Sequence, residues 1–191
     1  LRVHVHDHSG GIMTPEINIH ENPDAFKRVM ACIVFGRRDC IGFDLTITIN
    51  PKMTSFEGIT VNENVYNLLK VIFCNQGLVG RRTVCYLARR DGEEFIIKDH
   101  WVKGDKSVVL NEVEMLKALK DIPGVPQYVE HCLVEVEPGK VDDTQMYRQK
   151  IYNSTQGVYR THVRLVLKPR ARPLHEFRTR KELVKALRDI V

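Results

Sequence analysis

Lys98 and Glu112 are the two residues whose types and spacing best suggest chemistry. A helix is expected over residues 106–120, and on a wheel of about 100° per residue Glu112 falls inside its apolar arc. A carboxylate that faces a hydrophobic core is costly unless a cation pairs with it. Lys98 ends a strand expected over residues 95–98, and a helix that packs back on this strand brings Lys98 to Glu112. The sequence therefore predicts a Lys98–Glu112 ion pair.

A turn that contains Gly77 and Gly80 lies upstream of the lysine strand, between two apolar runs. A lysine held by a glutamate beneath a glycine loop is an arrangement that positions the phosphates of a nucleotide. The lysine supplies the positive charge, the glutamate orients it, and the loop offers backbone N–H groups. Each residue alone is more often a solvated surface charge, so the prediction of a phosphate site rests on the ordered set.

Three histidines near the start of the chain offer a second possible chemistry. His4, His6 and His8 alternate along a strand expected over residues 2–8, so they share one face of it. Alternate imidazoles on a strand can chelate Zn²⁺, Ni²⁺ or Cu²⁺. An exposed polar face near a chain end explains the same pattern without a metal, so metal binding is the weaker alternative.

The elements that must position these residues predict an α+β fold in three parts. Residues 1–58 form an accessory α+β segment. Residues 59–174 carry a series of antiparallel strands and the helix with Glu112. Residues 175–191 form one more helix.

Local signals mark the ends of several elements. Asn22 is placed to cap a helix, with Pro23 in its first turn. The Asp91-Gly92 pair between two apolar runs indicates a β-hairpin. The segment Thr179-Arg180-Lys181-Glu182 is a capping box that opens the last helix.

The composition excludes several classes of protein. Hydrophobic residues make up 43% of the 191 residues and charged residues 28%, as in an ordinary globular domain. The apolar runs are far shorter than a membrane span requires. The cysteines are odd in number and widely spaced, without a C-x-x-C pair, which disfavours a disulfide framework and a cysteine zinc site. This cysteine usage fits a reducing, intracellular setting.

The net charge of +5 permits a polyanionic partner. Basic residues outnumber acidic ones over residues 168–188, which raises nucleic-acid binding as an alternative function. No recognised nucleic-acid motif accompanies them and aromatic residues are few there. A solvated helix face, or a surface that meets another lobe, explains these charges better.

Around the lysine and glutamate the chain resembles the fungal-type protein kinases, a divergent branch of the eukaryotic protein-kinase fold. The similarity runs over nearly the whole chain. The segments that carry it are Asp7-His8-Ser9-Gly10, Ile17-Asn18-Ile19-His20, Pro23-Asp24-Ala25-Phe26, Ile41-Gly42-Phe43-Asp44, Gly80-Arg81-Arg82-Thr83, Ile96-Ile97-Lys98-Asp99-His100-Trp101, Asn111-Glu112-Val113, Asp142-Asp143-Thr144, Arg164-Leu165-Val166-Leu167 and Arg172-Pro173-Leu174. The resemblance implies a kinase-like small lobe and hinge over residues 59–174, preceded by the accessory segment and followed by the first helix of a large lobe.

The same resemblance implies ATP as ligand, with Mg²⁺, and phosphoryl transfer to Ser or Thr of a protein substrate. Lys98 would contact the phosphates and Glu112 would hold Lys98. The other implied binding residues are Gly77, Gly80 and Thr83 in the glycine loop, Ile96 with Val84 or Cys85 against adenine, Leu167 as gatekeeper, and the hinge backbone of residues 168–170, which includes Pro169.

Three departures from the family pattern limit these implications. Arg82 stands where the family usually has a second glycine, and a side chain there resists positive φ and a close approach to phosphate. Ile96 stands where kinases prefer a small residue, so it would crowd adenine. The sequence contains no His-Arg-Asp catalytic loop and no Asp-Phe-Gly, so the catalytic base and the Mg²⁺ ligands of the pattern are absent from it.

Two interpretations of the absent catalytic loop stay open. The chain is either a piece of an active kinase, in which a large lobe or a partner covers the small lobe, or a degenerate kinase used as a binding module. Leu1 in place of an initiator Met, and a helix that runs to Val191, favour a piece of a longer protein. In either case we expect that these 191 residues alone do not transfer phosphate.

Overall fold

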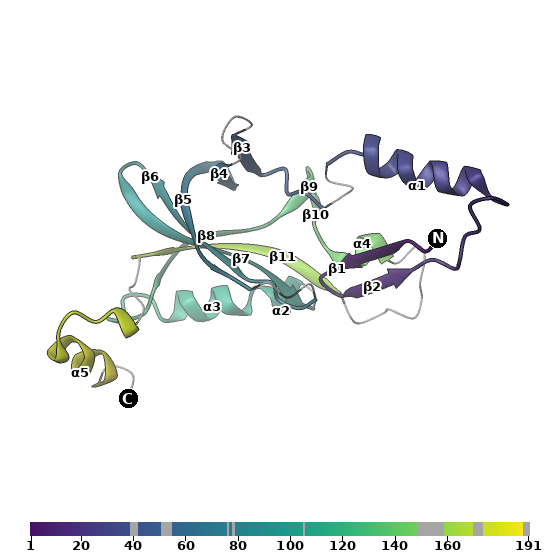
Figure 1. Ribbon diagram of the computed structural model, residues 1–191. Coiled ribbons are helices and arrows are strands. Elements are labelled where there is room, and N and C mark those ends of the chain that lie inside the picture. Colours follow the sequence, from purple (N-terminus) through teal and green to yellow (C-terminus); the bar gives the residue numbers. More distant parts are fainter. Residues whose placement is uncertain are drawn as a thin grey trace.

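The computed structural model describes residues 1–38, 42–50, 55–75, 77, 79–104, 106–148, 159–169 and 174–188. Its elements, in chain order, are β1 His4–Asp7, β2 Gly10–Met13, α1 Pro23–Phe35, β3 Ile47–Asn50, β4 Ser55–Val61, β5 Asn64–Cys74, β6 Val84–Arg90, β7 Glu93–Lys103, α2 Lys106–Val109, α3 Asn111–Ala118, β8 Gln127–Leu133, β9 Glu135–Glu137, β10 Lys140–Val141, α4 Thr144–Arg148, β11 Arg160–Lys168 and α5 Arg180–Arg188. The described chain is therefore α+β, with a curled antiparallel sheet and few helices (Figure 1).

The main sheet has seven strands in the order β3-β4-β5-β6-β7-β11-β8, and all its pairs are antiparallel. A two-residue turn joins β6 to β7, where Asp91 and Gly92 have φ values of 52° and 83°. This left-handed conformation is the one that a tight hairpin turn requires, so the predicted hairpin is confirmed. β11 lies between β7 and β8, which places residues 160–168 beside the lysine strand.

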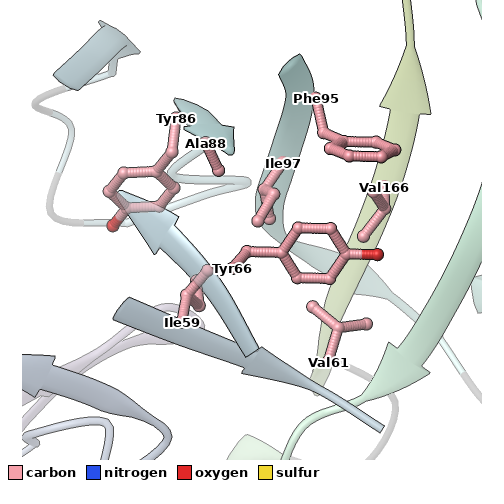
Figure 2. Packing of buried hydrophobic residues seen from close by; sticks show 8 residues of the cluster. All are labelled: Ile59, Val61, Tyr66, Tyr86, Ala88, Phe95, Ile97 and Val166. Atoms are coloured by element: carbon pink, nitrogen blue, oxygen red, sulfur yellow. The ribbon is translucent and has the colours of Figure 1, made fainter. Parts of the chain in front are cut away.

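The two faces of the sheet differ in what covers them. Alternation along β7 directs Phe95 and Ile97 to one face, and Ile96 and Lys98 to the other. The first face holds a hydrophobic core made of Ile59, Val61, Tyr66, Tyr86, Ala88, Phe95, Ile97 and Val166 (Figure 2). Each large side chain in such a core contributes about 1.5–3 kcal/mol, so this packing fixes which face of β7 is left for Lys98.

Glu130 on the edge strand β8 connects this strand to the β4–β5 hairpin. Its carboxylate accepts hydrogen bonds from Nδ2 of Asn62 at 2.8 Å and of Asn64 at 2.9 Å, both beside the β4–β5 turn. It also accepts one from the hydroxyl of Tyr66. These contacts join β8 to the β4–β5 hairpin, so the sheet curls over its own core.

The helix predicted over residues 106–120 is divided in two, which corrects the sequence interpretation. α2 ends at Val109 and α3 begins at Asn111, with one residue between them. Val109 and Val113 are buried, whereas Met115 of the predicted apolar arc is 57% exposed. Leu116 is half-buried, so the part of the arc that packs is narrower than predicted and leaves Met115 in solvent.

The accessory segment shares strands with the main sheet. β3 pairs with β4, so the strands on both sides of the boundary predicted between residues 58 and 59 belong to one sheet. β1 and β2 form a separate hairpin, and α1 extends beyond it (Figure 1). Asn22 caps α1 as predicted, because its Oδ1 accepts a hydrogen bond from the backbone N–H of Ala25 at 3.2 Å.

The last described helix, α5, begins where the capping box predicts. The hydroxyl of Thr179 accepts a hydrogen bond from the backbone N–H of Glu182 at 3.1 Å. α5 extends away from the end of the main sheet (Figure 1). Within the described ranges, no helix is both long enough and apolar enough to cross a bilayer.

Candidate functional site

Lys98 and Glu112 meet on the face of β7 opposite the core. Lys98 Nζ lies 2.5 Å from Oε1 of Glu112, which projects from the first turn of α3. The side chain of Lys98 is 24% exposed and that of Glu112 41% exposed, so the pair is half-buried and open to a solute on one side. The ion pair that the sequence predicts is therefore present, and its role toward a nucleotide stays a prediction.

His100 is a second partner of Glu112 that the sequence interpretation did not name. Its Nε2 lies 3.4 Å from Oε2 of Glu112, and the ring is 3% exposed. Hydrogen bonding from His100 and from Lys98 outweighs the effect of burial and lowers the pKa of Glu112 to about 2. The available signal was spacing, because His100 follows Lys98 by two residues and so shares its face of the strand.

Strand register decides which apolar residues stand beside Lys98. Cys85 on β6 and Leu165 on β11 are its cross-strand neighbours, so both lie on its face. Val84 packs against the core on the opposite face. Of the two residues that the sequence left open as adenine contacts, Cys85 is therefore the one on the face of Lys98. Burial raises the pKa of Cys85, so its thiol stays protonated at neutral pH.

Ile96 and Leu167 form the next row along the same face. Leu167 is the cross-strand partner of Ile96, and both side chains are half-buried. Lys168 ends β11 and Pro169 follows it, and both are exposed. Arg170, the last residue of the predicted hinge, lies outside the described residues.

The glycine loop closes between β5 and β6. The backbone N–H of Asn75 donates to the carbonyl of Thr83 at 3.0 Å. The N–H of Gly77 donates to Oδ1 of Asn75 at 3.1 Å, and the N–H of Gly80 donates to the carbonyl of His8 at 3.0 Å. Both glycine amides thus have partners inside the protein, and one partner belongs to the accessory segment.

Arg82 adopts a conformation that a side chain there was expected to resist. Its φ is 35°, in the left-handed region. The backbone next to Arg82 is anchored, because the N–H of Trp101 on β7 donates to the carbonyl of Arg81 at 2.8 Å. That anchor offers a reason why the strained conformation of Arg82 is kept.

Arg82 also affects a histidine of the accessory segment. Burial of the His8 ring, together with the charge of Arg82, lowers the pKa of His8 to about 4.

A buried ion network centred on Arg164 lies on the core side of β7 and β11. Arg164 is fully buried, and its guanidinium donates to the carboxylates of Asp44 and Asp99, to the hydroxyl of Thr46 and to the carbonyl of Thr60. Asp44 and Thr46 come from the accessory segment, whereas Asp99 directly follows the site lysine. The network therefore joins the accessory segment to the strand that carries the site.

The whole chain matches one known family. The family model described as fungal protein kinase covers residues 1–191. The chain belongs to the fungal protein kinase family. No curated protein matches it. The curled antiparallel sheet with a lysine strand, a glutamate helix and few other helices is compatible with the small lobe of this family.

Sequence reasoning missed the roles of Arg164 and His162 in this family member. Both alternate with apolar residues along β11, and a charged side chain on a buried face calls for a partner. His162 Nε2 lies 2.6 Å from Asp99 Oδ1, and its Nδ1 lies 3.1 Å from Asp142 Oδ2. Burial alone would lower the pKa of His162, but the two carboxylates raise it to about 9.

The alternative metal site at the N-terminus of this family member is not assembled by the described residues. His4 and His6 have stacked rings with centroids 6.2 Å apart. β1 ends at Asp7, so the alternation stops there, and the ring of His8 packs on Trp101 at 4.3 Å. Among the described residues, these three histidines do not bring their ligand atoms close enough together to hold a metal ion.

Asp44, Asp99 and His162 also lie close enough together to suggest a metal site. Arg164 donates to both carboxylates, and the raised pKa of His162 makes it a second cation at neutral pH. Two positive side chains already balance the acids, so the cluster is an internal ion network.

The charge on His162 predicts how the stability of the folded chain changes between pH 6.5 and 9. Its pKa rises from 6.5 in the unfolded chain to about 9 on folding, so its contribution is full below pH 6.5 and is lost as the pH increases to 9. We expect the free energy of unfolding in urea to fall by up to about 3 kcal/mol over this range. His162→Gln should flatten the slope, and replacement of the exposed His20 by Gln should not. A level profile in the unaltered chain would contradict a charged His162.

Proposed function

We propose that the main sheet and α3 form the ATP-binding lobe of a protein kinase, in which Lys98 contacts the nucleotide phosphates. The observation that carries the proposal is the 2.5 Å contact between Lys98 and Glu112 on the face of the sheet opposite the hydrophobic core. The loop over residues 75–83 closes at the end of the two strands beside it. Membership in the fungal protein kinase family supports ATP as ligand and a protein as substrate.

Each site residue has a separate task in this proposal. Lys98 neutralises phosphate charge, and Glu112, ionised because its pKa is about 2, orients the ammonium group. The half-buried side chains of Ile96, Cys85 and Leu167 provide an apolar surface for the adenine ring. These residues would hold the phosphates of ATP through Lys98 and its adenine on the apolar surface, with Ile96 limiting how closely the ring approaches.

Mg²⁺ does not fit these residues in the same way. The carboxylates that bind the metal in kinases belong to motifs that the sequence lacks, and Glu112 is already engaged by Lys98 and His100. The base that would accept a Ser or Thr hydroxyl proton belongs to the same absent motifs. We accordingly propose that these 191 residues bind ATP and do not by themselves transfer its phosphate.

A binding module without catalysis is the second candidate, and the glycine loop favours it. The N–H of Gly80, which a nucleotide-binding loop would offer to phosphate, donates to the carbonyl of His8. A loop held in this way supplies fewer backbone donors to a triphosphate. In this second candidate the lobe binds nucleotide weakly, and its function is to bind a partner through its surface.

Calorimetric titration of the chain with ATP and with adenosine tests the proposal. We expect saturable binding of both, with ATP bound more tightly because Lys98 acts on the phosphates alone. The preference for ATP should weaken as salt is raised, because the phosphate contact is electrostatic. Absence of saturable ATP binding would overturn the proposed function. Equal affinities for ATP and adenosine would show that Lys98 does not contact the phosphates. A kinase assay of the same sample with Mg²⁺ should give no transfer.

A further inference from the structure

The two carboxylate oxygens of Glu112 have different partners, and both partners come from β7. Oε1 lies 2.5 Å from Lys98 Nζ, and Oε2 lies 3.4 Å from His100 Nε2. Residues two apart on a strand project from the same face, so the register that presents Lys98 also presents His100. The carboxylate is therefore held at two points.

His100 is a fixed part of this arrangement. Its ring is 3% exposed, and its Nδ1 has no hydrogen-bond partner among the described residues. Among the described residues, Glu112 is thus the polar partner of the His100 ring. A buried imidazole keeps its N–H bonded where it can, which assigns the proton to Nε2 and leaves a lone pair on Nδ1. In this tautomer His100 donates to Glu112.

The Lys98–Glu112 contact alone would hold the lysine poorly. Glu112 is 41% exposed, and ion pairs at such positions are screened by water and cost side-chain entropy. A phosphate group that binds Lys98 also competes with Glu112 for the ammonium protons. A second donor that is rigid and buried keeps the carboxylate in place during that competition.

We propose that His100 is a positioning residue, which fixes Glu112 so that Lys98 stays directed at the nucleotide phosphates. The inference rests on the proposed ATP site and deepens it. His100 itself touches no ligand, and it acts through Glu112 on Lys98. Replacing His100 should therefore change the affinity only for ligands that carry phosphates, and only while Lys98 is present.

The test compares ATP and adenosine affinities, by calorimetry, in variants of the full chain. In His100→Leu we expect ATP affinity to fall roughly 5- to 10-fold, the value of one ordinary hydrogen bond, with adenosine affinity unchanged. His100→Gln should restore most of the loss, because its side-chain amide reaches as far as Nε2. His100→Asn is the matched control, since its amide corresponds to Nδ1 and falls short of Glu112.

Two further measurements separate a positioning role from a structural one. In a Lys98→Met background, His100→Leu should change ATP affinity less than about twofold. The carboxyl pKa of Glu112, followed by NMR, should rise from its value of about 2 in His100→Leu and stay low in His100→Gln.

The outcomes distinguish this inference from the proposed function. If the unaltered chain binds ATP and His100→Asn binds it as well as His100→Gln does, the positioning role is wrong and the ATP site stands. If His100→Leu weakens adenosine as much as ATP, its role is structural. If the unaltered chain binds no ATP, both proposals fall together.

Discussion

Replacing Arg164 with Met should lower the free energy of unfolding by about 3–5 kcal/mol, the cost of removing one partner of a buried ion pair. The guanidinium is fully buried, and its loss leaves the carboxylates of Asp44 and Asp99 without their shared cation. Asp44 would then have to ionise without its cation or take up a proton, and Asp99 would keep only His162 as a charged partner. Urea unfolding followed by the fluorescence of Trp101, the single tryptophan, measures the change.

Two comparisons make the result specific to the network. Arg89→Met removes an exposed arginine that pairs with Glu94, and it should cost less than about 1 kcal/mol. Adding Asp99→Asn to Arg164→Met should cost less than the two single losses combined, because a carboxylate that lost its contact with Arg164 is then gone as well. A loss below about 1 kcal/mol in Arg164→Met would show that the network does not stabilise the fold in this way.

Replacing Lys98 with Met should weaken ATP binding about 10- to 100-fold and leave adenosine binding unchanged. A charge-assisted contact to phosphate is lost, whereas the apolar surface at Ile96 and Leu167 is retained. The fold should tolerate the change, because the pair is half-buried and Glu112 keeps its contact with His100. Calorimetric titrations of both chains with ATP and with adenosine measure the change in each affinity.

Lys103→Met serves as the matched control for this variant. Lys103 ends the same strand, β7, and its side chain is exposed, so removal of its charge should leave both affinities unchanged. Equal ATP affinity in Lys98→Met and in the unaltered chain would exclude Lys98 from the phosphate site. An equal loss in both lysine variants would assign the effect to net charge, which is a screened, long-range contribution.

The sequence by itself predicted the elements whose signals are local. The Asp91-Gly92 hairpin and the caps at Asn22 and Thr179 depend on short-range geometry, and each is present. The helical wheel also singled out Glu112, because an acid inside an apolar arc needs a partner nearby. The same wheel failed at Met115, since periodicity does not reveal how much of a helix the sheet covers.

Tertiary structure decided the partners that come from distant parts of the chain. Arg164 meets Asp44 and Asp99 only because β11 pairs with β7 while the accessory segment lies over the same face. The contact of Gly80 with His8 likewise joins segments far apart in sequence. A sequence pattern indicates that a buried charge needs a partner. The order of the strands, which decides which residue becomes that partner, cannot be read from the pattern. The sequence therefore predicted the Lys98–Glu112 pair, and the folded sheet determined the contacts that hold it.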